Sequence, residues 1–407
     1  MDIKVDINGL GIQEEEYKEL RLKTGGILDR LWSGKEPMTG WVQAPLHRDK
    51  EEMDYLLNVA DIIKAEAELM VVIGVGGAYT GAKAAIEALP KSEDGIEVRF
   101  AGINFCSAYH SRLIEEINRR NTVVCVVSKS GSTPEVRAAF DILKELMIKK
   151  YGSKEHAYRR IIAITDKETG ALREEAEREG YITFDIPKDI PGRYAALTPM
   201  GLLPMAVAGI DIQGLLDGAA KMAVSPAWDG AGADYGIGRF LMQKMGKAME
   251  VLEFFDTRFE YFGEWLKQLY SESEGKEGRG LFPAAVNFTS DIHSVGQFLQ
   301  QGSQIFFETV ILTEVCENDI RINDGPLKGK TLGEINKAAS DLVINTRKEQ
   351  NRPVAVINVP ELTAYNYGQL LYFFEMTCAV TAMLMGVNPF DQPGVDTYKK
   401  EIKEILL

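Results

Sequence analysis

The sequence is poor in the residues from which disulfides and metal centres are made. Four cysteines occur among the 407 residues, at 106, 125, 316 and 378, and no two of them form a Cys-x-x-Cys pair. The four histidines, at 47, 110, 156 and 293, are scattered in the same way. Neither a disulfide framework nor a metal site is therefore indicated, and we expect no metal in the chemistry.

Long apolar runs and an excess of positive charge are also missing. No segment approaches the ~18 uncharged apolar residues of a membrane span. The amino terminus, Met-Asp-Ile-Lys-Val-Asp, lacks the basic region and apolar core of a signal peptide. A formal net charge of −14 argues against nucleic acid or an anionic membrane as the main partner. We expect a cytoplasmic protein that acts on a small molecule.

Strand-like and helical patterns alternate in the first half of the chain. Five apolar, largely β-branched runs are separated mostly by helical patterns, which predicts a doubly wound parallel sheet. The runs are Leu69 to Gly74, Val98 to Ile103, Thr122 to Val127, Ile161 to Thr165 and Ile182 to Ile186. Before them, residues 1–55 have a helical pattern that we expect to be interrupted at Gly25 and Gly26.

The second half repeats the alternation more loosely, and a second α/β unit is expected there. Strands are predicted at Met249 to Phe255, Ile305 to Val315 and Val354 to Val359, and helices at Phe259 to Ser271, Ser294 to Gln301, Leu332 to Gln350 and Tyr367 to Met385. Val224 to Ala233 is predicted to be an exposed loop. The expected organisation is a helical extension at 1–55, α/β domains at 56–210 and 211–390, and a helical tail at 391–407.

The most informative segment is the turn between the run ending at Val127 and the helical pattern beginning at Pro134. Its sequence, Ser128-Lys-Ser-Gly-Ser-Thr133, places four hydroxyls where backbone N–H groups and the positive end of a helix dipole are expected. An ordinary capped turn is the alternative, since serine and threonine are common caps. Four hydroxyls in six residues exceed the needs of one cap, so the turn predicts a phosphate site.

A second glycine-rich turn follows the first predicted strand. Gly74-Val-Gly-Gly-Ala-Tyr-Thr-Gly81 fits the dinucleotide fingerprint poorly, and no acidic residue ends the next strand where a ribose partner is needed. These glycines are expected to let the backbone approach a polar ligand beside the serine-rich turn. Tight packing of helix on strand is an equally good explanation of this turn taken alone.

Four further segments contain candidate catalytic side chains. They are Tyr270-Ser-Glu-Ser-Glu-Gly-Lys276, Ile292-His-Ser-Val-Gly-Gln297, Pro191-Gly-Arg-Tyr194 and Asn388-Pro-Phe-Asp-Gln-Pro-Gly-Val-Asp-Thr-Tyr-Lys399. On a helix, Glu272 and Glu274 point in different directions, so one of them at most faces a given site. Each segment alone also has a plain explanation: a solvated glutamate, a capping histidine, a surface arginine or a charged terminal helix.

Taken together with the two turns, these segments closely resemble the glucose-6-phosphate isomerase family. Six motifs occur in the family's order and extend from about residue 40 to the end of the chain, which is far more specific than any one motif. The resemblance implies two sugar-isomerase domains, each a doubly wound, flavodoxin-like parallel sheet. It also implies reversible isomerisation of glucose 6-phosphate and fructose 6-phosphate through ring opening and an enediolate.

The resemblance also assigns roles to residues. The base that moves a proton between C2 and C1 is Glu272, ring opening is assigned to His293 and Lys399, and Arg193 lies beside the enediolate. The substrate-binding residues implied are Ser128, Lys129, Ser130 and Thr133 at the phosphate, Gln268 and Gln392 along the substrate, and Gly77 and Ala78 at the sugar. Family members usually have serine at positions 78 and 195, where this chain has alanine.

No cofactor is demanded by this chemistry, and the family's histidine reaches its site from a neighbouring subunit. We therefore expect a homodimer with a shared active site. Two alternatives stay open at this point. One is a dual phosphoglucose/phosphomannose isomerase. The other is a non-enzymatic regulator that binds a sugar phosphate, although such a protein has no need to retain Glu272, Arg193, His293 and Lys399 together.

Overall fold

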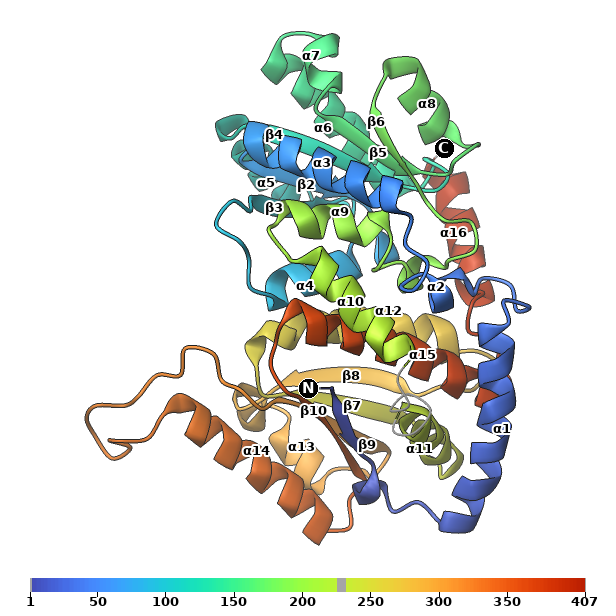
Figure 1. The fold of residues 1–407 in the computed structure, drawn as a ribbon, viewed down its shortest axis with the longest axis vertical. Helices are drawn as coiled ribbons and strands as arrows, with labels where there is room; N and C mark the ends of the chain where they lie inside the picture. The colour runs from blue at the N-terminus through green and yellow to red at the C-terminus, as the bar shows by residue number, and fades with distance from the viewer. Residues whose placement is uncertain (1, 225–231, 407) are drawn as a thin grey trace. The chain divides into compact units, whose positions relative to one another are not determined.

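Two compact units make up the protein in the computed structural model, which describes residues 2–224 and 232–406. Unit 1 joins Met1–Glu36 to Gly214–Asp391, and unit 2 joins Pro37–Gln213 to Gln392–Leu407. Each unit contains one five-stranded sheet. Both sheets are drawn as arrows in Figure 1. Apart from one amino-terminal strand, each predicted domain contains one sheet, and the domain bounds 56–210 and 211–390 stay a prediction.

The sheet of unit 2 is parallel throughout, with the strand order β3-β2-β4-β5-β6. Its first strand, β2, lies inside the sheet, so the chain passes to one side to form β3 and then returns to the other side to form β4. This is the flavodoxin-like order, in which the switch point lies between β2 and β4. The strands are β2 Leu69–Ile73, β3 Glu97–Ala101, β4 Thr122–Val127, β5 Ile161–Thr165 and β6 Ile182–Asp185.

Helices complete unit 2, and their apolar faces bury the sheet. The core includes Val124 and Val126 of β4 together with Phe140 and Leu143 of α6. The carboxyl-terminal helix α16 packs against α6. The helices are α2 Gly40–Gln43, α3 Lys50–Glu66, α4 Thr80–Ala88, α5 Ser107–Arg119, α6 Pro134–Tyr151, α7 Lys154–Tyr158, α8 Ala171–Glu179, α9 Pro199–Val207 and α16 Pro393–Leu406, with short 3₁₀ turns η2 Gly76–Ala78 and η3 Gly192–Tyr194.

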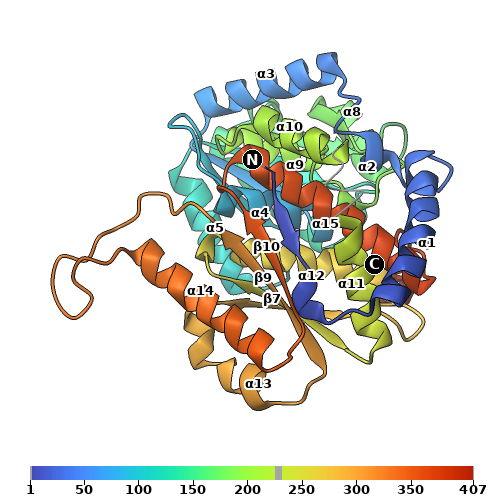
Figure 2. The ribbon, with the colours of Figure 1, turned by 60° about the horizontal axis from the view of Figure 1, so that its bottom comes forward.

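The sheet of unit 1 has the order β1-β10-β9-β7-β8. Strands β7 to β10 are parallel and follow the same switched order as in unit 2, whereas β1 pairs antiparallel with β10 at the edge. Figure 2 shows α13 and α14 beside this sheet. The strands are β1 Lys4–Asp6, β7 Met249–Phe254, β8 Phe282–Asn287, β9 Phe306–Thr313 and β10 Val354–Val359.

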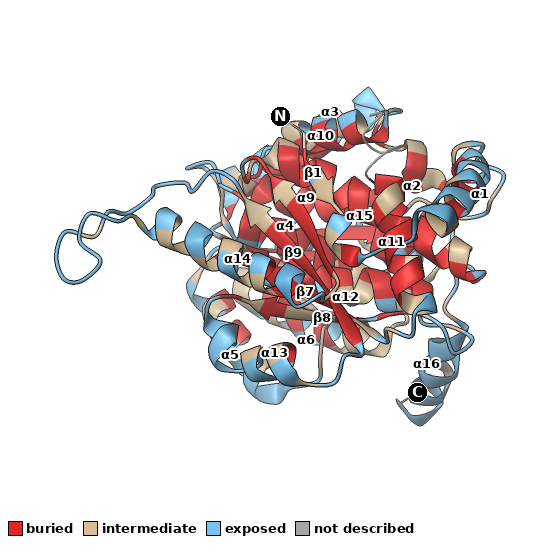
Figure 3. Cartoon of the chain, turned by 90° about the horizontal axis from the view of Figure 1, so that it is seen from below, coloured by how far each residue is buried: buried red, intermediate tan, exposed pale blue. Residues whose placement is uncertain are grey.

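The long helix α15 is the centre of the helical layer of unit 1. Contrary to the expectation from the sequence, it is long and apolar enough to resemble a membrane span, with a mean hydropathy of 1.3, but 89% of that apolar window is buried within the protein (Figure 3). It packs against α1, α11 and α12. The helices are α1 Glu14–Trp32, α10 Ile212–Ala223, α11 Ala233–Lys244, α12 Glu260–Glu274, α13 Gly296–Gln301, α14 Leu332–Glu349 and α15 Ala364–Met385, with 3₁₀ turns η1 Asn8–Leu10, η5 Thr257–Phe259 and η6 Ser290–His293.

Three features differ from the sequence predictions. Helix α1 continues through Gly25 and Gly26, because buried residues such as Leu20 and Ile27 on either side pack its apolar face. Strand β1 has three residues and is formed by pairing rather than by a pattern of its own. Strand β8 was not predicted. It contains Pro283, which is tolerated because β8 lies at the edge of the sheet. The loop predicted at Val224 to Ala233 lies largely outside the described residues.

Candidate active site

The serine-rich turn lies at the amino terminus of α6, directly after β4. Within it, the Ser128 hydroxyl accepts a hydrogen bond of 3.0 Å from the Gly131 amide, and the Ser130 hydroxyl accepts one of 3.2 Å from the Ser132 amide. As an acceptor in this bond, the Ser128 hydroxyl keeps its own O–H for donation to an anion. The Ser130 hydroxyl also lies 3.0 Å from that of Ser132, and either of these two can be the donor. Helix α6 begins at Pro134, as predicted, and Thr133 is its N-cap residue.

A glycine gives this turn its shape. Gly131 has a φ of +74°, and a Cβ there would lie 2.5 Å from the backbone nitrogen of Leu172, at the start of α8. A residue with a side chain is excluded by both conditions. The turn is thus held against a neighbouring helix, while Lys129 and Ser130 remain exposed. The structure therefore brings Ser128, Lys129, Ser130 and Thr133 together at one helix terminus, where an anion is stabilised by amides and by the dipole.

The glycine-rich turn after β2 touches the turn that contains Arg193. A Cβ on Gly77 would lie 2.1 Å from the carbonyl oxygen of Gly192, so the two backbones are in direct contact. Arg193 is 1% exposed, and its guanidinium lies 5.6 Å from the centre of the Tyr194 ring. Ala78 is 9% exposed in the same turn as Gly77. Gly77 thus serves close packing of one turn on another, and the expected approach of its backbone to a polar ligand stays a prediction.

These turns all lie at the same edge of the unit 2 sheet. They follow the carboxyl ends of β2, β4 and β6, and the first two flank the switch point of the strand order. In open α/β sheets, ligands bind in the crevice outside this edge. Nine of the predicted residues belong to unit 2: Gly77, Ala78, Ser128, Lys129, Ser130, Thr133, Arg193, Gln392 directly before α16, and Lys399. Lys399 lies on α16, and its side chain is outside the described part of the structure.

Unit 1 contains the predicted base. Glu272 lies in the last turn of α12 and is partly buried, and Gln268, one turn earlier, donates a hydrogen bond of 3.1 Å from Nε2 to Glu272 Oε1. Glu274 points elsewhere, because it is fully buried and bound by Arg239 of α11. The prediction that these two carboxylates face different surroundings is confirmed. Arg239 itself was not predicted, since one arginine within a helix carries no motif.

His293 lies far from Glu272 within unit 1. It is exposed in η6, which follows the carboxyl end of β8, whereas α12 returns from the carboxyl end of β7 and ends where β8 begins. The six residues of β8 span about 20 Å, so the two residues lie near opposite ends of this strand. The Asp291 carboxylate fixes the η6 turn by accepting hydrogen bonds from the Asn287 amide at 2.7 Å and the Ser294 hydroxyl at 2.8 Å.

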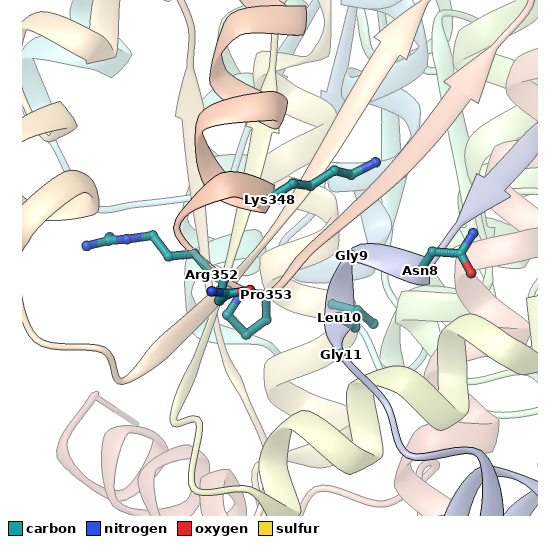
Figure 4. A pocket seen from close by; sticks show the side chains of 8 residues that line it. Asn8, Gly9, Leu10, Gly11, Lys348, Arg352 and Pro353 are labelled. Carbon is teal, nitrogen blue, oxygen red and sulfur yellow. The ribbon is translucent and has the colours of Figure 1, made fainter.

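Two surface hollows of the described residues lie away from the predicted site residues. One, of about 340 Å³, is bordered by η1 and by the end of α14, with Lys348 and Asn8 on its rim (Figure 4). The other, of about 590 Å³, is bordered by α3 and β6, and its lining includes Glu52 and Arg173. Neither contains a predicted site residue. Among the described residues, no three His, Cys, Asp or Glu side chains are grouped so as to hold a metal ion.

Comparisons with known proteins place the whole chain in one family. The family model described as phosphoglucose isomerase matches residues 61–311 and 312–406. A glucose-6-phosphate isomerase of Clostridium tetani is 41% identical over 99% of this chain and 96% of its own length. One of Clostridioides difficile is 43% identical over 90% of this chain and 86% of its own length.

Solved structures agree on the fold. A hypothetical protein from Thermus thermophilus superposes with a TM-score of 0.90 at 28% identity, covering 99% of each chain. A glucose-6-phosphate isomerase from Chlamydia trachomatis superposes with a TM-score of 0.86 at 20% identity, covering 99% of this chain and 88% of its own. The predicted α/β class is confirmed by these likenesses and by the parallel sheets. The chain belongs to the phosphoglucose isomerase family.

Proposed function

We propose that this protein interconverts glucose 6-phosphate and fructose 6-phosphate by ring opening and proton transfer through an enediolate. The observation that carries the proposal is the family match, which spans every predicted site residue from Gly77 to Lys399. Relatives named for this reaction cover nearly the whole chain. This favours the reaction over a dual phosphoglucose/phosphomannose isomerase and over a non-enzymatic regulator.

The substrate phosphate binds at the amino terminus of α6. Ser128, Ser130 and Thr133 donate hydroxyl hydrogen bonds there, and Lys129 adds its backbone amide. The net charge of −14 repels a phosphorylated sugar at long range, so local donors must supply the attraction. Hydrogen bonds to a charged group are worth about 1.5–3 kcal/mol each, enough to register C1 and C2 of the sugar against the base. Gln268 and Gln392 hold the substrate, and Gly77 and Ala78 line the sugar.

Glu272 is the base of the isomerisation. Its carboxylate removes the proton from C2 of the open-chain aldose and returns it to C1, and the reverse reaction retraces these steps. A positioned base of this kind contributes about 10²–10⁴-fold to the rate. The hydrogen bond from Gln268 orients the carboxylate. Arg193 stabilises the negative charge on the enediolate oxygens, because a guanidinium remains protonated throughout.

Ring opening needs an acid and a base at the hemiacetal, and His293 and Lys399 take these roles. We propose that His293 reaches the site from a second subunit of a homodimer. Within a single chain, His293 and Glu272 lie far apart, at opposite ends of the strands of unit 1, and this separation supports the proposal. Symmetric dimers are also the commonest assembly of soluble enzymes.

The proposal includes a cytoplasmic location and a route without a cofactor. Purified protein is to be assayed with fructose 6-phosphate and, separately, with mannose 6-phosphate, coupling the glucose 6-phosphate formed to a dehydrogenase. We expect rapid turnover of fructose 6-phosphate and little of mannose 6-phosphate. Comparable rates with both sugars would identify a dual isomerase, and tight binding without turnover would identify a regulator.

A further inference from the structure

A fully buried ion cluster lies in unit 1 directly behind the proposed base, and the mechanism above does not use it. Its members are Arg239 of α11, Glu250 of β7 and Glu274 of α12, each with 0% of its surface exposed. Two buried carboxyl groups share one guanidinium, and burial raises the pKa of Glu274 above its ordinary value. Apolar side chains of similar volume are often as stable or more stable than such a cluster, so stability alone is a weak explanation for it.

The guanidinium of Arg239 is fixed on every side. Its two terminal nitrogens bind the two carboxylate oxygens of Glu274 as a fork, with the Nη2 to Oε2 distance at 3.1 Å, and its Nε donates to Glu250 at 2.8 Å. The guanidinium carbon lies 3.6 Å from the centre of the Tyr270 ring. The second oxygen of Glu250 accepts hydrogen bonds from Tyr235 at 2.5 Å and from Thr309 at 2.8 Å. Bidentate pairs of this kind fix direction as well as distance.

The cluster acts on the last turn of α12. Glu274 is the final residue of the helix, and Glu272 precedes it by two residues, so the two side chains project in nearly opposite directions. Binding Glu274 with a rigid fork therefore sets the rotation of the last turn and with it the direction of Glu272. Helix ends fray unless they are tied down, and here the next residues are held as well, because Lys276 Nζ lies 2.8 Å from Asp391 Oδ1.

We infer that Arg239 is a positioning residue for Glu272, acting through the fork to Glu274. The inference rests on the proposed role of Glu272 as base. Loosening the fork lets the last turn of α12 rotate or fray, which moves the base relative to C2 of the sugar. A displacement of about 1 Å at the reacting atoms costs up to about 10²-fold in rate. The phosphate loop belongs to unit 2 and is not part of the cluster, so substrate affinity is expected to be kept.

The test compares Glu274→Gln with Glu175→Gln. Both substitutions neutralise a buried carboxylate bound by cations, but Glu175 of α8 pairs with Arg137 and Lys144 in unit 2. Each variant is assayed with glucose 6-phosphate carrying hydrogen or deuterium at C2. For Glu274→Gln we expect a fall in kcat of about tenfold, an unchanged KM and a larger deuterium isotope effect, because proton transfer becomes slower than the other steps. For Glu175→Gln we expect wild-type values.

Arg239→Lys serves as a second variant, since it keeps the charge and removes the fork, and it is expected to behave like Glu274→Gln. A purely structural role lowers the fraction of active enzyme and leaves the isotope effect unchanged, which would overturn the inference. Wild-type kcat in both variants would overturn it as well.

Glu272→Gln is measured in parallel. If it retains turnover, the proposed base is wrong. If it is inactive while the other two variants are normal, only the positioning role fails.

Discussion

At the scale of single residues, some hydroxyls of the serine-rich turn are hydrogen-bonded within the turn, whereas the Thr133 hydroxyl makes no capping bond to any described residue. Ser128 accepts a hydrogen bond from the Gly131 amide and thereby shapes the turn, whereas Ser132 lies against the Ser130 hydroxyl at 3.0 Å. Thr133 is the N-cap of α6, yet within the described structure its side chain makes no capping bond to the helix amides. A threonine at a cap whose hydroxyl is not used for capping is consistent with a role toward the substrate.

The combined substitution Ser128→Ala and Thr133→Ala is predicted to raise the KM for fructose 6-phosphate strongly. Two hydrogen bonds to a phosphate dianion are lost, each worth about 1.5–3 kcal/mol. Steady-state kinetics measure the effect, and thermal unfolding shows whether the fold is kept. The matched control is Ser132→Ala, which removes a hydroxyl from the same turn and is predicted to change KM little. An unchanged KM in the double variant would mean that the phosphate binds elsewhere.

At the scale of elements, the backbone contact between the η2 and η3 turns is the feature on which Arg193 depends. Strands β2 and β6 end at the same edge of the sheet, but contact between their turns requires that Gly77 have no side chain, because the Gly192 oxygen is 2.1 Å from the Cβ position. This packing places the arginine of one turn beside the glycines of the other.

Gly77→Ala is therefore predicted to lower both thermal stability and kcat, since the added methyl group pushes the Arg193 turn away. Overpacking of this kind typically costs about 1–3 kcal/mol. Gly25→Ala is the control, because Gly25 lies within α1 with open space around its Cβ position. It is predicted to raise stability by about 0.5–1 kcal/mol and to leave activity unchanged. Equal stability in the two variants would contradict the account of this contact.

The adjacent strands β7 and β9 of the unit 1 sheet contain a buried pair of carboxyl groups, Glu253 and Glu308. Burial beside Glu308 holds the pKa of Glu253 well above its ordinary value of 4.5, while Oε2 of Glu308 itself lies 2.6 Å from Nε of Arg347. At a pH above the ordinary glutamate value, Glu253 thus keeps a proton in the folded protein that it loses in the unfolded chain. A pKa that is raised on folding makes stability fall as the pH rises above the ordinary glutamate value.

Glu253→Gln is predicted to remove this dependence. At pH 8 the variant is expected to unfold at a higher urea concentration than the wild type, and the difference is expected to shrink toward pH 5. Raising a pKa by one corresponds to about 1.4 kcal/mol of free energy. Glu308→Gln, which breaks the pair with Arg347, is expected to destabilise instead. Parallel pH dependence in the wild type and in Glu253→Gln would show that Glu253 is ionised in the folded protein.

The elements that form the site were predictable where local pattern and tertiary fold agree. Strands β4, β5 and β10 begin and end at the predicted residues, because apolar, largely β-branched runs bounded by polar residues or by proline leave few alternatives. Helix α13 begins at Gly296, two residues later than predicted. Strands β1 and β8 were missed because pairing with a neighbour, rather than periodicity, creates them.

The site residues were found through motif order, and their supporting contacts were not. Arg239 and Glu250 belong to no motif. Their role can be inferred only from the hydrogen bonds of Arg239 to Glu250 and Glu274, which form when the chain folds. The sequence also leaves open which residues of one chain come together. The separation of His293 from Glu272 follows from the direction of α12 relative to β8, a property of the topology.

At the scale of the whole molecule, the proposed homodimer predicts that two inactive variants restore activity when they form mixed dimers. Glu272→Gln and His293→Ala are each expected to inactivate the enzyme when present in both subunits. Refolding the two variants together is expected to restore activity, because a mixed dimer contains one site with both residues intact. Absence of activity in mixed dimers verified by mass would place both residues in the site of one subunit.

The most direct test of the account is the fate of the C2 proton. Glucose 6-phosphate is incubated in D₂O with wild-type protein and with Glu272→Gln, and NMR follows the product and the entry of deuterium into the sugar. We predict isomerisation and deuterium uptake with the wild type. We predict a loss of both by about 10²–10⁴-fold in the variant, which still binds a phosphorylated inhibitor. Near-normal turnover and exchange in Glu272→Gln would contradict the assignment of the base.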